Sequence, residues 1–148
     1  MARDIKLTQN STTKNWDISF SNGDFALTEG LDTALYLSVL GEARASASQV
    51  PNPALRRGHF TNTFSRVEGY EIGSLLWHYS QLPNTEQNRS LVEDSVSNGT
   101  KWLLDDSIVA DINVEVERSR EGYNITVNLT NQEQQQSNFY ELFVKTFN

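Results

Sequence analysis

Apolar and polar residues alternate most regularly in the C-terminal third of the chain. Apolar side chains occupy every second position in 112–116 and again in 123–129, with a polar turn at 118–122 between them. A period of two is typical of strands that bury one face, so we predict an antiparallel hairpin. The run 138–147 is apolar on both faces. We expect a third strand there, either covered on both sides or exposed as a template for pairing.

The central part of the chain has helical spacing instead. Residues 31–43 place apolar side chains over more than half of a helix circumference, which predicts a largely buried helix beginning near Gly30. Residues 72–79 have the pattern of a second helix. A third is expected from an N-cap at Asn84 or Thr85 to about residue 105.

Shorter signals lie near the N-terminus. Residues 16–20 alternate in polarity, and Asn22-Gly23 follows before a second short run, 24–28. Asn-Gly favours a type I′ turn, so we predict a hairpin that pairs 16–21 with 24–28. Residues 4–7 alternate like another short strand, and we find no internal repeat. Together these elements predict one α+β domain over 1–148, with an N-terminal β-hairpin, about three helices and a C-terminal three-stranded antiparallel sheet.

Composition narrows the kind of partner and the kind of chemistry. Twelve Lys and Arg against nineteen Asp and Glu give a net charge of -7, which disfavours nucleic acid or an anionic membrane as the main partner. The chain contains no cysteine, so disulfides and thiolate chemistry are excluded, as is usual in a reducing cytoplasm. We read no apolar signal peptide and no membrane-spanning run, and we expect protein partners.

A long loop at 48–63 contains Arg56-Arg57-Gly58-His59-Phe60. Guanidiniums can fork onto carboxylates and an aromatic ring can anchor in a pocket, so we favour a docking or bracing loop over disorder. Two interpretations of the arginines stay open. Arg44, Arg56, Arg57 and Arg66 form a basic face for an acidic partner, or they pair within the chain with Glu42, Glu68 and Glu71.

The end of the third predicted helix carries Asp105 and Asp106, where carboxylates oppose the negative helix terminus. In one interpretation, one of them receives an arginine, from Arg44, Arg56 or a partner. In the other, both are solvated and Ser107 helps to end the helix.

Signals for catalysis are weak. The two histidines, His59 and His78, are far apart, and no nucleophile, phosphate-loop or metal-site motif can be traced. Pairs such as Glu42 with Glu68 or Glu71 allow a glycosidase arrangement, but acids beside arginines are more often ion-paired than catalytic. We expect no enzyme activity, no cofactor and no metal.

Several short motifs resemble a known family when taken in order. They are Leu-Asp-Thr-Ala-Leu at 31–35, Gly41-Glu42-Ala43-Arg44, Arg56-Arg57-Gly58, Ile72-Gly73-Ser74-Leu75-Leu76-Trp77 and Trp102-Leu103-Leu104-Asp105-Asp106. Over 16–130 the chain resembles the Mu-like phage baseplate wedge family, a relative of the sheath-initiating wedge proteins of contractile tails and type VI secretion systems. That wider family has a Glu-Pro-Arg triplet where this chain has Asp105-Asp106-Ser107, so at most the acid is carried over.

The resemblance implies a structural protein of the virion, assembled in the host cytoplasm and placed in the tail baseplate as a ring of about six copies. Its partners would be other wedge proteins, the tail sheath, and the tail tube or hub. Its C-terminal sheet would accept sheath arms by strand addition, and thereby start the first sheath ring. The alternative is a cell-wall-degrading, lysozyme-like glycosidase of the tail.

Two sets of site residues follow from this interpretation. Residues expected to dock on the wedge are Glu42, Arg44, Arg56, Arg57, His59, Phe60, Asp105 and Asp106. Residues expected to contact the sheath are Phe139, Tyr140, Leu142, Phe143, Val144 and Phe147.

Overall fold

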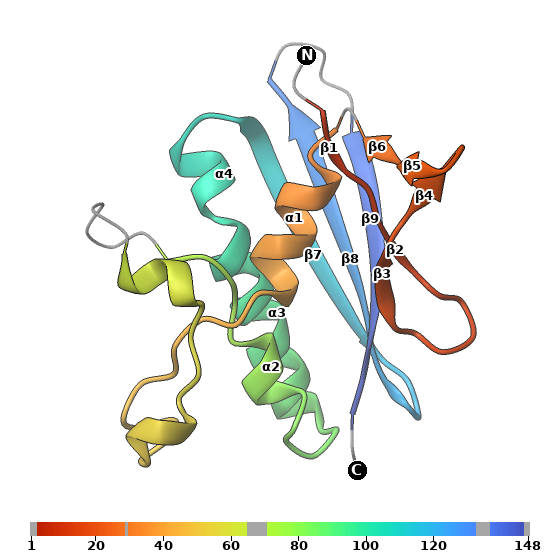
Figure 1. Ribbon diagram of the computed structural model, residues 1–148. Helices are drawn as coiled ribbons and strands as arrows, with labels where there is room; N and C mark the ends of the chain where they lie inside the picture. The colour runs from red at the N-terminus through yellow and green to blue at the C-terminus, as the bar shows by residue number, and fades with distance from the viewer. Residues whose placement is uncertain (1–2, 29, 65–70, 133–136, 147–148) are drawn as a thin grey trace.

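A computed structural model describes residues 3–28, 30–64, 71–132 and 137–146. Its centre is an antiparallel sheet of three strands in the order β7 (Val109–Arg118), β8 (Gly122–Asn131) and β9 (Ser137–Lys145). The four α-helices of the described residues lie on one side of this sheet, and the N-terminal strands lie beside β9 (Figure 1). The helices are α1 (Asp32–Leu40), α2 (Leu76–Tyr79), α3 (Glu86–Thr100) and α4 (Trp102–Asp105). The predicted α+β fold is confirmed.

The core lies between the inner face of the sheet and the helices. Alternate side chains of β8, from Tyr123 to Leu129, are buried, as the period of two predicts. They pack with Leu35 and Val39 of α1 and with Val92 and Val96 of α3. The outer face of the sheet is polar apart from Phe139 and Phe143 of β9, and most of its carboxylates are on β7. None of the helices in the described part of the chain has the length and apolar character that crossing a bilayer requires.

The helices begin and end differently from the prediction. The helix expected over 72–79 shrinks to the single turn of α2, because Gly73 has a positive φ of 102° and Ser74 forms a parallel bridge with Glu42. The third predicted helix is divided into α3 and α4, with Thr85 as its N-cap. The side-chain oxygen of Thr85 accepts from the backbone N–H of Asn88 at 3.2 Å.

Gly99 marks a close crossing of elements. A Cβ added there would come within 2.8 Å of the Ser74 Cβ and 2.9 Å of the Ser38 carbonyl oxygen. Both Ser74 and Ser38 are buried. The absence of a side chain therefore allows α3, α1 and the segment before α2 to meet at one point.

The N-terminal strands do not form the single hairpin that we predicted. Asn22 and Gly23 both have positive φ, as a type I′ turn requires, but this turn joins only β4 (Phe20–Ser21) to β5 (Asp24–Phe25). The remaining strands pair over longer distances in the sequence. They are β1 (Asp4–Ile5) with β6 (Leu27–Thr28), and β2 (Leu7–Gln9) with β3 (Trp16–Ile18).

These six strands form a module with approximate three-fold symmetry, residues 4–28. Its three bent segments share the pattern Asp, apolar, any residue, apolar, Ser or Thr: Asp4-Ile5-Lys6-Leu7-Thr8, Asp17-Ile18-Ser19-Phe20-Ser21 and Asp24-Phe25-Ala26-Leu27-Thr28. The three central residues bond in a ring: Lys6 N–H to Ala26 O at 2.8 Å, Ala26 N–H to Ser19 O at 2.8 Å, and Ser19 N–H to Lys6 O at 2.9 Å. The conclusion that the chain has no internal repeat was therefore wrong.

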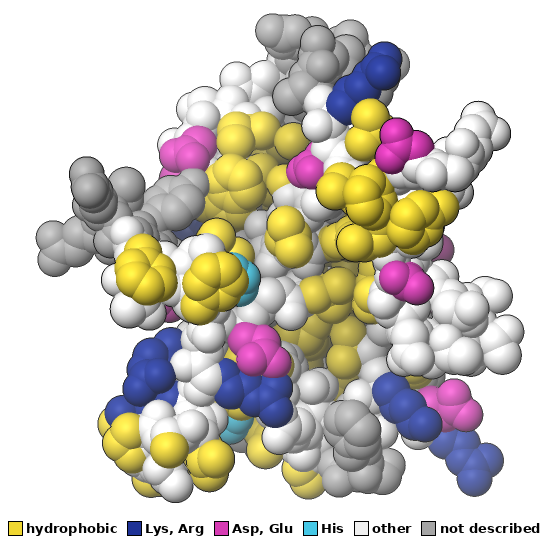
Figure 2. All heavy atoms as spheres, in the orientation of Figure 1, with side chains coloured by type: hydrophobic (Ala, Val, Ile, Leu, Met, Phe, Trp, Pro, Cys, Tyr) yellow, Lys and Arg dark blue, Asp and Glu magenta, His cyan; other side chains and the backbone are white. Residues whose placement is uncertain are grey.

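The module has one apolar face. The apolar positions pair directly across strands, Ile5 with Leu27, Leu7 with Ile18 and Phe20 with Phe25. Because the two apolar residues of each segment are two positions apart, all three pairs share a side. Phe20 is 68% exposed, and Figure 2 shows hydrophobic side chains gathered over β4–β6.

Candidate functional site

The loop that precedes α2 is the first candidate surface, and we call residues 41–64 the docking loop. It has defined structure, including two 3₁₀ turns, Pro53–Leu55 and Phe60–Thr63. Arg44 donates to the Arg57 carbonyl at 3.0 Å and to the Pro53 carbonyl at 3.3 Å. Arg56 donates to the carbonyls of Val50 at 2.7 Å and Pro51 at 2.8 Å. These two guanidiniums therefore brace the loop itself.

Arg57 also binds within the chain. Its Nη1 lies 2.6 Å from Oε1 of Glu42, and its guanidinium lies 4.7 Å from the centre of the Trp77 ring. Its backbone is left-handed, with φ 52°, next to Gly58 with φ 119°. The Trp77 indole in turn donates to the Ala43 carbonyl at 2.8 Å. Of the two open interpretations of the arginines, internal bonding holds for Arg57, while Arg66 and Glu68 lie outside the described residues.

The docking loop exposes three large apolar side chains among its polar and charged ones. Phe60 is 72% exposed and Phe64 77% exposed, and Leu55 is also largely exposed (Figure 2). The ring of His59 stacks on Phe60 with centroids 4.9 Å apart, and its Nδ1 lies 2.6 Å from the Thr61 hydroxyl. The expectation of an aromatic anchor at Phe60 matches this exposure. Leu55 and Phe64 were missed, although apolar residues in a loop without helical or strand periodicity have no predicted core partner.

The end of α4 explains the Asp-Asp-Ser sequence. The N–H of Ile108 donates to the Leu103 carbonyl and that of Ser107 to the Leu104 carbonyl, each at 2.9 Å. Ser107 has φ 57°. This pair of bonds is a Schellman motif with serine in the left-handed position, where glycine is usual. Ser107 therefore ends the helix, as one of the two interpretations proposed.

Asp105 is paired within its own helix. Lys101 Nζ lies 2.6 Å from its Oδ1, one turn earlier. The suggested acceptance of Arg44 or Arg56 by Asp105 is wrong, because those guanidiniums bond to loop carbonyls and this carboxylate to Lys101. Since the ion pair is more than half exposed, it leaves Asp105 accessible to a partner but not dependent on one.

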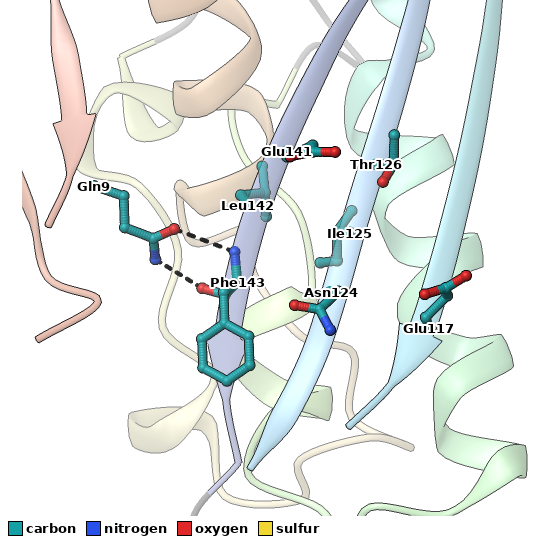
Figure 3. A pocket seen from close by; sticks show the side chains of 8 residues that line it. All are labelled: Gln9, Glu117, Asn124, Ile125, Thr126, Glu141, Leu142 and Phe143. Carbon is teal, nitrogen blue, oxygen red and sulfur yellow. Dashed lines mark hydrogen bonds between the residues drawn. The ribbon is translucent and has the colours of Figure 1, made fainter. Parts of the chain in front are cut away.

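The second candidate surface is the free edge of β9. The Phe143 N–H donates to Oε1 of Gln9 at 3.2 Å, and the Phe143 carbonyl accepts from Nε2 of the same side chain at 2.9 Å (Figure 3). In an antiparallel pair the N–H and C=O of one residue point to the same edge, and successive residues alternate. Phe139, Glu141 and Phe143 therefore direct their backbone away from β8.

The other edge of the sheet follows the same register. Phe143 lies opposite Asn124 on β8, which lies opposite Glu117 on β7. Alternation then points the Val116 backbone outward, and its carbonyl accepts from Arg89 Nη1 of α3 at 3.2 Å. The register therefore gives the same assignment of outward-facing backbone at both edges. At each edge one outward residue is bonded by a side chain, Phe143 by Gln9 and Val116 by Arg89.

The predicted sheath-contact residues divide by face. Tyr140 and Leu142 are buried on the inner face, so the expectation that they contact a partner has to be corrected. Val144 is half-buried on the same face, and Phe147 lies outside the described residues. Phe139 is 69% exposed on the outer face, where Phe143 is half-buried. β9 is therefore covered on one face only.

Aromatic rings tie the N-terminal module to β9. Trp16 lies against Tyr36 of α1 with centroids 4.5 Å apart, and Tyr36 meets Tyr140 edge-on at 6.2 Å. Burial, followed by the nearby Asp32 carboxylate, raises the pKa of the Tyr140 phenol. The module is thus fixed beside the β9 edge by packing and by Gln9, and both candidate surfaces belong to a braced structure.

Neither carboxylates nor histidines of the described residues form a catalytic arrangement that we can trace. Glu42 is held by Arg57. Of its two candidate partners, Glu68 lies outside the described residues, and the ion pairs found among the described residues do not include Glu71. His59 belongs to the docking loop and His78 to α2. Within the described ranges, His, Asp and Glu nowhere gather in a group of three or more that could hold a metal ion.

Comparison with known families places the chain. The model of the family described as phage protein GP46 matches residues 31–136, which include all four helices, the docking loop and strands β7 and β8. The search of curated proteins finds no match. The family match covers more than half of the chain and leaves out the N-terminal module and β9. The protein therefore belongs to the phage protein GP46 family.

Proposed function

We propose that this phage protein is a structural wedge component of a contractile tail baseplate, which initiates the sheath by accepting extended sheath segments at its C-terminal sheet. The family membership supports a phage role. The observation that carries the finer proposal is the edge of β9, where Phe139, Glu141 and Phe143 direct their backbone away from the sheet. Strand addition needs such an edge, because main-chain hydrogen bonds supply its affinity.

The docking loop provides a separate attachment to neighbouring wedge proteins. Arg44, Arg56 and Arg57 hold it in one conformation, so its exposed apolar side chains are presented without a large ordering cost on binding. Phe60 and Phe64 would enter apolar pockets of the neighbour. We also propose that the protein has no enzymatic activity and that it acts in the virion as one of about six copies.

The test is co-expression with the sheath protein encoded in the same phage genome. The variant Glu141→Pro removes one N–H on the outer edge while leaving the bonds to β8, so it should abolish sheath capture and keep the fold. Leu142→Pro, its neighbour, removes a bond to β8 and should damage the sheet itself.

Sheath capture by wild type and its loss in folded Glu141→Pro would support the proposal. Equal capture by wild type and Glu141→Pro would refute strand addition at β9. Failure of wild type to capture the sheath at all would refute sheath initiation, whatever the variants do.

A further inference from the structure

We propose that the β9 edge binds an extended segment in which a basic residue is flanked by apolar residues, and that Gln9 and Lys14 occupy the position of this segment until it binds. This inference rests on the proposed function, because it concerns the same sheet edge. It adds the chemistry of the segment and the step that makes room for it.

Gln9 stands where a strand residue would stand. Its primary amide both donates to the Phe143 carbonyl and accepts from the Phe143 N–H, at 2.9 and 3.2 Å (Figure 3). A strand residue paired with Phe143 would make the same two bonds. The Gln9 Nε2 also donates to the Lys14 carbonyl at 2.9 Å, which fixes the amide in this orientation.

Lys14 supplies the positive charge that the basic residue of a bound segment would bring. Its Nζ lies 5.6 Å from the centre of the Phe143 ring, within the range of a cation–π contact. Its backbone is left-handed, with φ 62°, in the turn between β2 and β3. The amide of Gln9 at the end of β2 and the ammonium of Lys14 in the following turn therefore meet β9 at a single residue.

The outer face of β9 indicates which side chains a bound segment would carry. In the middle of the strand the outward side chains are Phe139, Glu141 and Phe143, with Ser137 and Lys145 at the two ends of the same row. Residues directly opposite each other in a sheet pair by type, aromatic with apolar and acid with base. A segment with Lys or Arg opposite Glu141, and apolar residues two positions to either side, would match all three.

The surface around Glu141 strengthens the preference for a base. A trough of about 440 Å³ beside Gln9 is lined on this face by Glu117, Asn124, Thr126, Glu141 and Phe143 (Figure 3). The ion pairs found among the described residues include neither Glu117 nor Glu141. A cation entering the trough would thus meet two carboxylates.

A second copy of this chain fits the edge poorly. Antiparallel pairing of two β9 strands about Glu141 would match Phe139 with Phe143 but would set one Glu141 against the other. Like charges directly opposite each other destabilise a sheet. The edge therefore selects a basic segment of another protein over self-association.

Gln9 and Lys14 can leave the β9 edge without breaking a strand pair. Within the described residues, the backbone–backbone hydrogen bonds of the N-terminal module are made inside the module and none joins it to β9. Only side chains hold the contact with Phe143, so an entering strand has the two hydrogen bonds of Gln9 and the Lys14 contact to displace. Two ordinary hydrogen bonds correspond to about a tenfold change in affinity.

The probe is an acetylated and amidated peptide, Thr-Val-Thr-Lys-Thr-Val-Thr, compared with the same peptide carrying Glu in place of Lys. Binding is followed by NMR titration of the labelled full-length protein, with the Phe143 amide as reporter. Gln9→Ala should bind the Lys peptide about tenfold more tightly than wild type. Thr8→Ala is the matched control, because Thr8 is adjacent on β2 and bonds to Ser19 on the other face of the module. It should bind as wild type does.

Gln9→Glu keeps the side-chain length but replaces the donor that faces the Phe143 carbonyl, so it should also bind more tightly. The dispersion of the NMR spectra shows that the variants are folded. Equal or weaker binding by both folded Gln9 variants would overturn the inference, as would equal binding of the Lys and Glu peptides or no peptide binding by any variant. Sheath capture by wild type is measured separately, so a result that refutes the role of Gln9 would not refute sheath initiation.

Discussion

Gly99→Ala should destabilise the protein although alanine is the better helix former. The new Cβ would meet the Ser74 Cβ at 2.8 Å and the Ser38 carbonyl oxygen at 2.9 Å, and the second of these is backbone. Overpacking of this kind costs about 1–3 kcal/mol, whereas replacing glycine in a helix gains about 1 kcal/mol. We therefore expect a net loss of up to about 2 kcal/mol. For a domain of this size that lowers the Tm by up to roughly 8 °C.

The control is Ser97→Ala on the same helix, where the side chain is exposed and the change should lie within about 0.5 kcal/mol. Ser74→Gly removes the nearer of the two contacts, together with two hydrogen bonds of the Ser74 hydroxyl, so Gly99→Ala should cost less in the Ser74→Gly background than in wild type. Urea unfolding followed by circular dichroism gives all five stabilities. If Gly99→Ala is as stable as wild type or more so, the crossing of α3 with α1 is not as close as described here.

Three other predictions concern single side chains. Tyr123→Phe removes a hydroxyl that is buried with no hydrogen-bond partner among the described residues. It should raise the free energy of unfolding, measured by urea titration, by about 1 kcal/mol. A lower free energy of unfolding would indicate that the hydroxyl has a partner. Burial lowers the pKa of His78 in the folded state, so its contribution is present above the unfolded pKa of about 6.5 and declines as the pH falls through that value. The Tm of His78→Gln should therefore lose less than that of wild type on acidification from about pH 8 to about pH 5, and parallel losses would contradict this. Phe60→Ser changes an exposed side chain, so it should alter the free energy of unfolding by less than about 0.5 kcal/mol. It should weaken the capture of neighbouring wedge proteins in pull-downs, and unchanged capture would show that Phe60 is not in the interface.

The sheet could be predicted because its information is local. β7 alternates from Ile112 to Val116 and β8 from Tyr123 to Leu129, and a slip of one residue would move every apolar side chain of these stretches to the wrong face. The N-terminal module could not be predicted in the same way. Its repeat is only five residues long, and the pairing of Ile5 with Leu27 joins segments that no turn signal connects. The Asn-Gly turn was read correctly, but it fixes just two residue pairs.

The docking loop shows a different limit of sequence reasoning. The sequence reveals that arginines gather between 44 and 57, but their partners are mostly backbone carbonyls of the loop, such as those of Val50 and Pro53. Every residue has a backbone carbonyl, so the residue type does not indicate which carbonyl will accept a hydrogen bond. The pair of Arg57 with Glu42 was among the alternatives because it joins two charged residues. Phe60 was identified because an aromatic side chain in a polar loop is itself a signal.

The positions of the two candidate surfaces bear on how the protein would work in an assembly. The docking loop projects on the side of the helices, while Gln9 and the β9 edge lie on the side of the N-terminal module, with the sheet and α1 between them (Figure 1). A partner on the loop would therefore leave the edge of β9 accessible. Because the aromatic contacts from Trp16 through Tyr36 to Tyr140 tie the N-terminal module to β9, a partner that moved the module would also move Gln9. Attachment through the loop alone would leave Gln9 in place, and opening of the β9 edge would depend on the segment that displaces it.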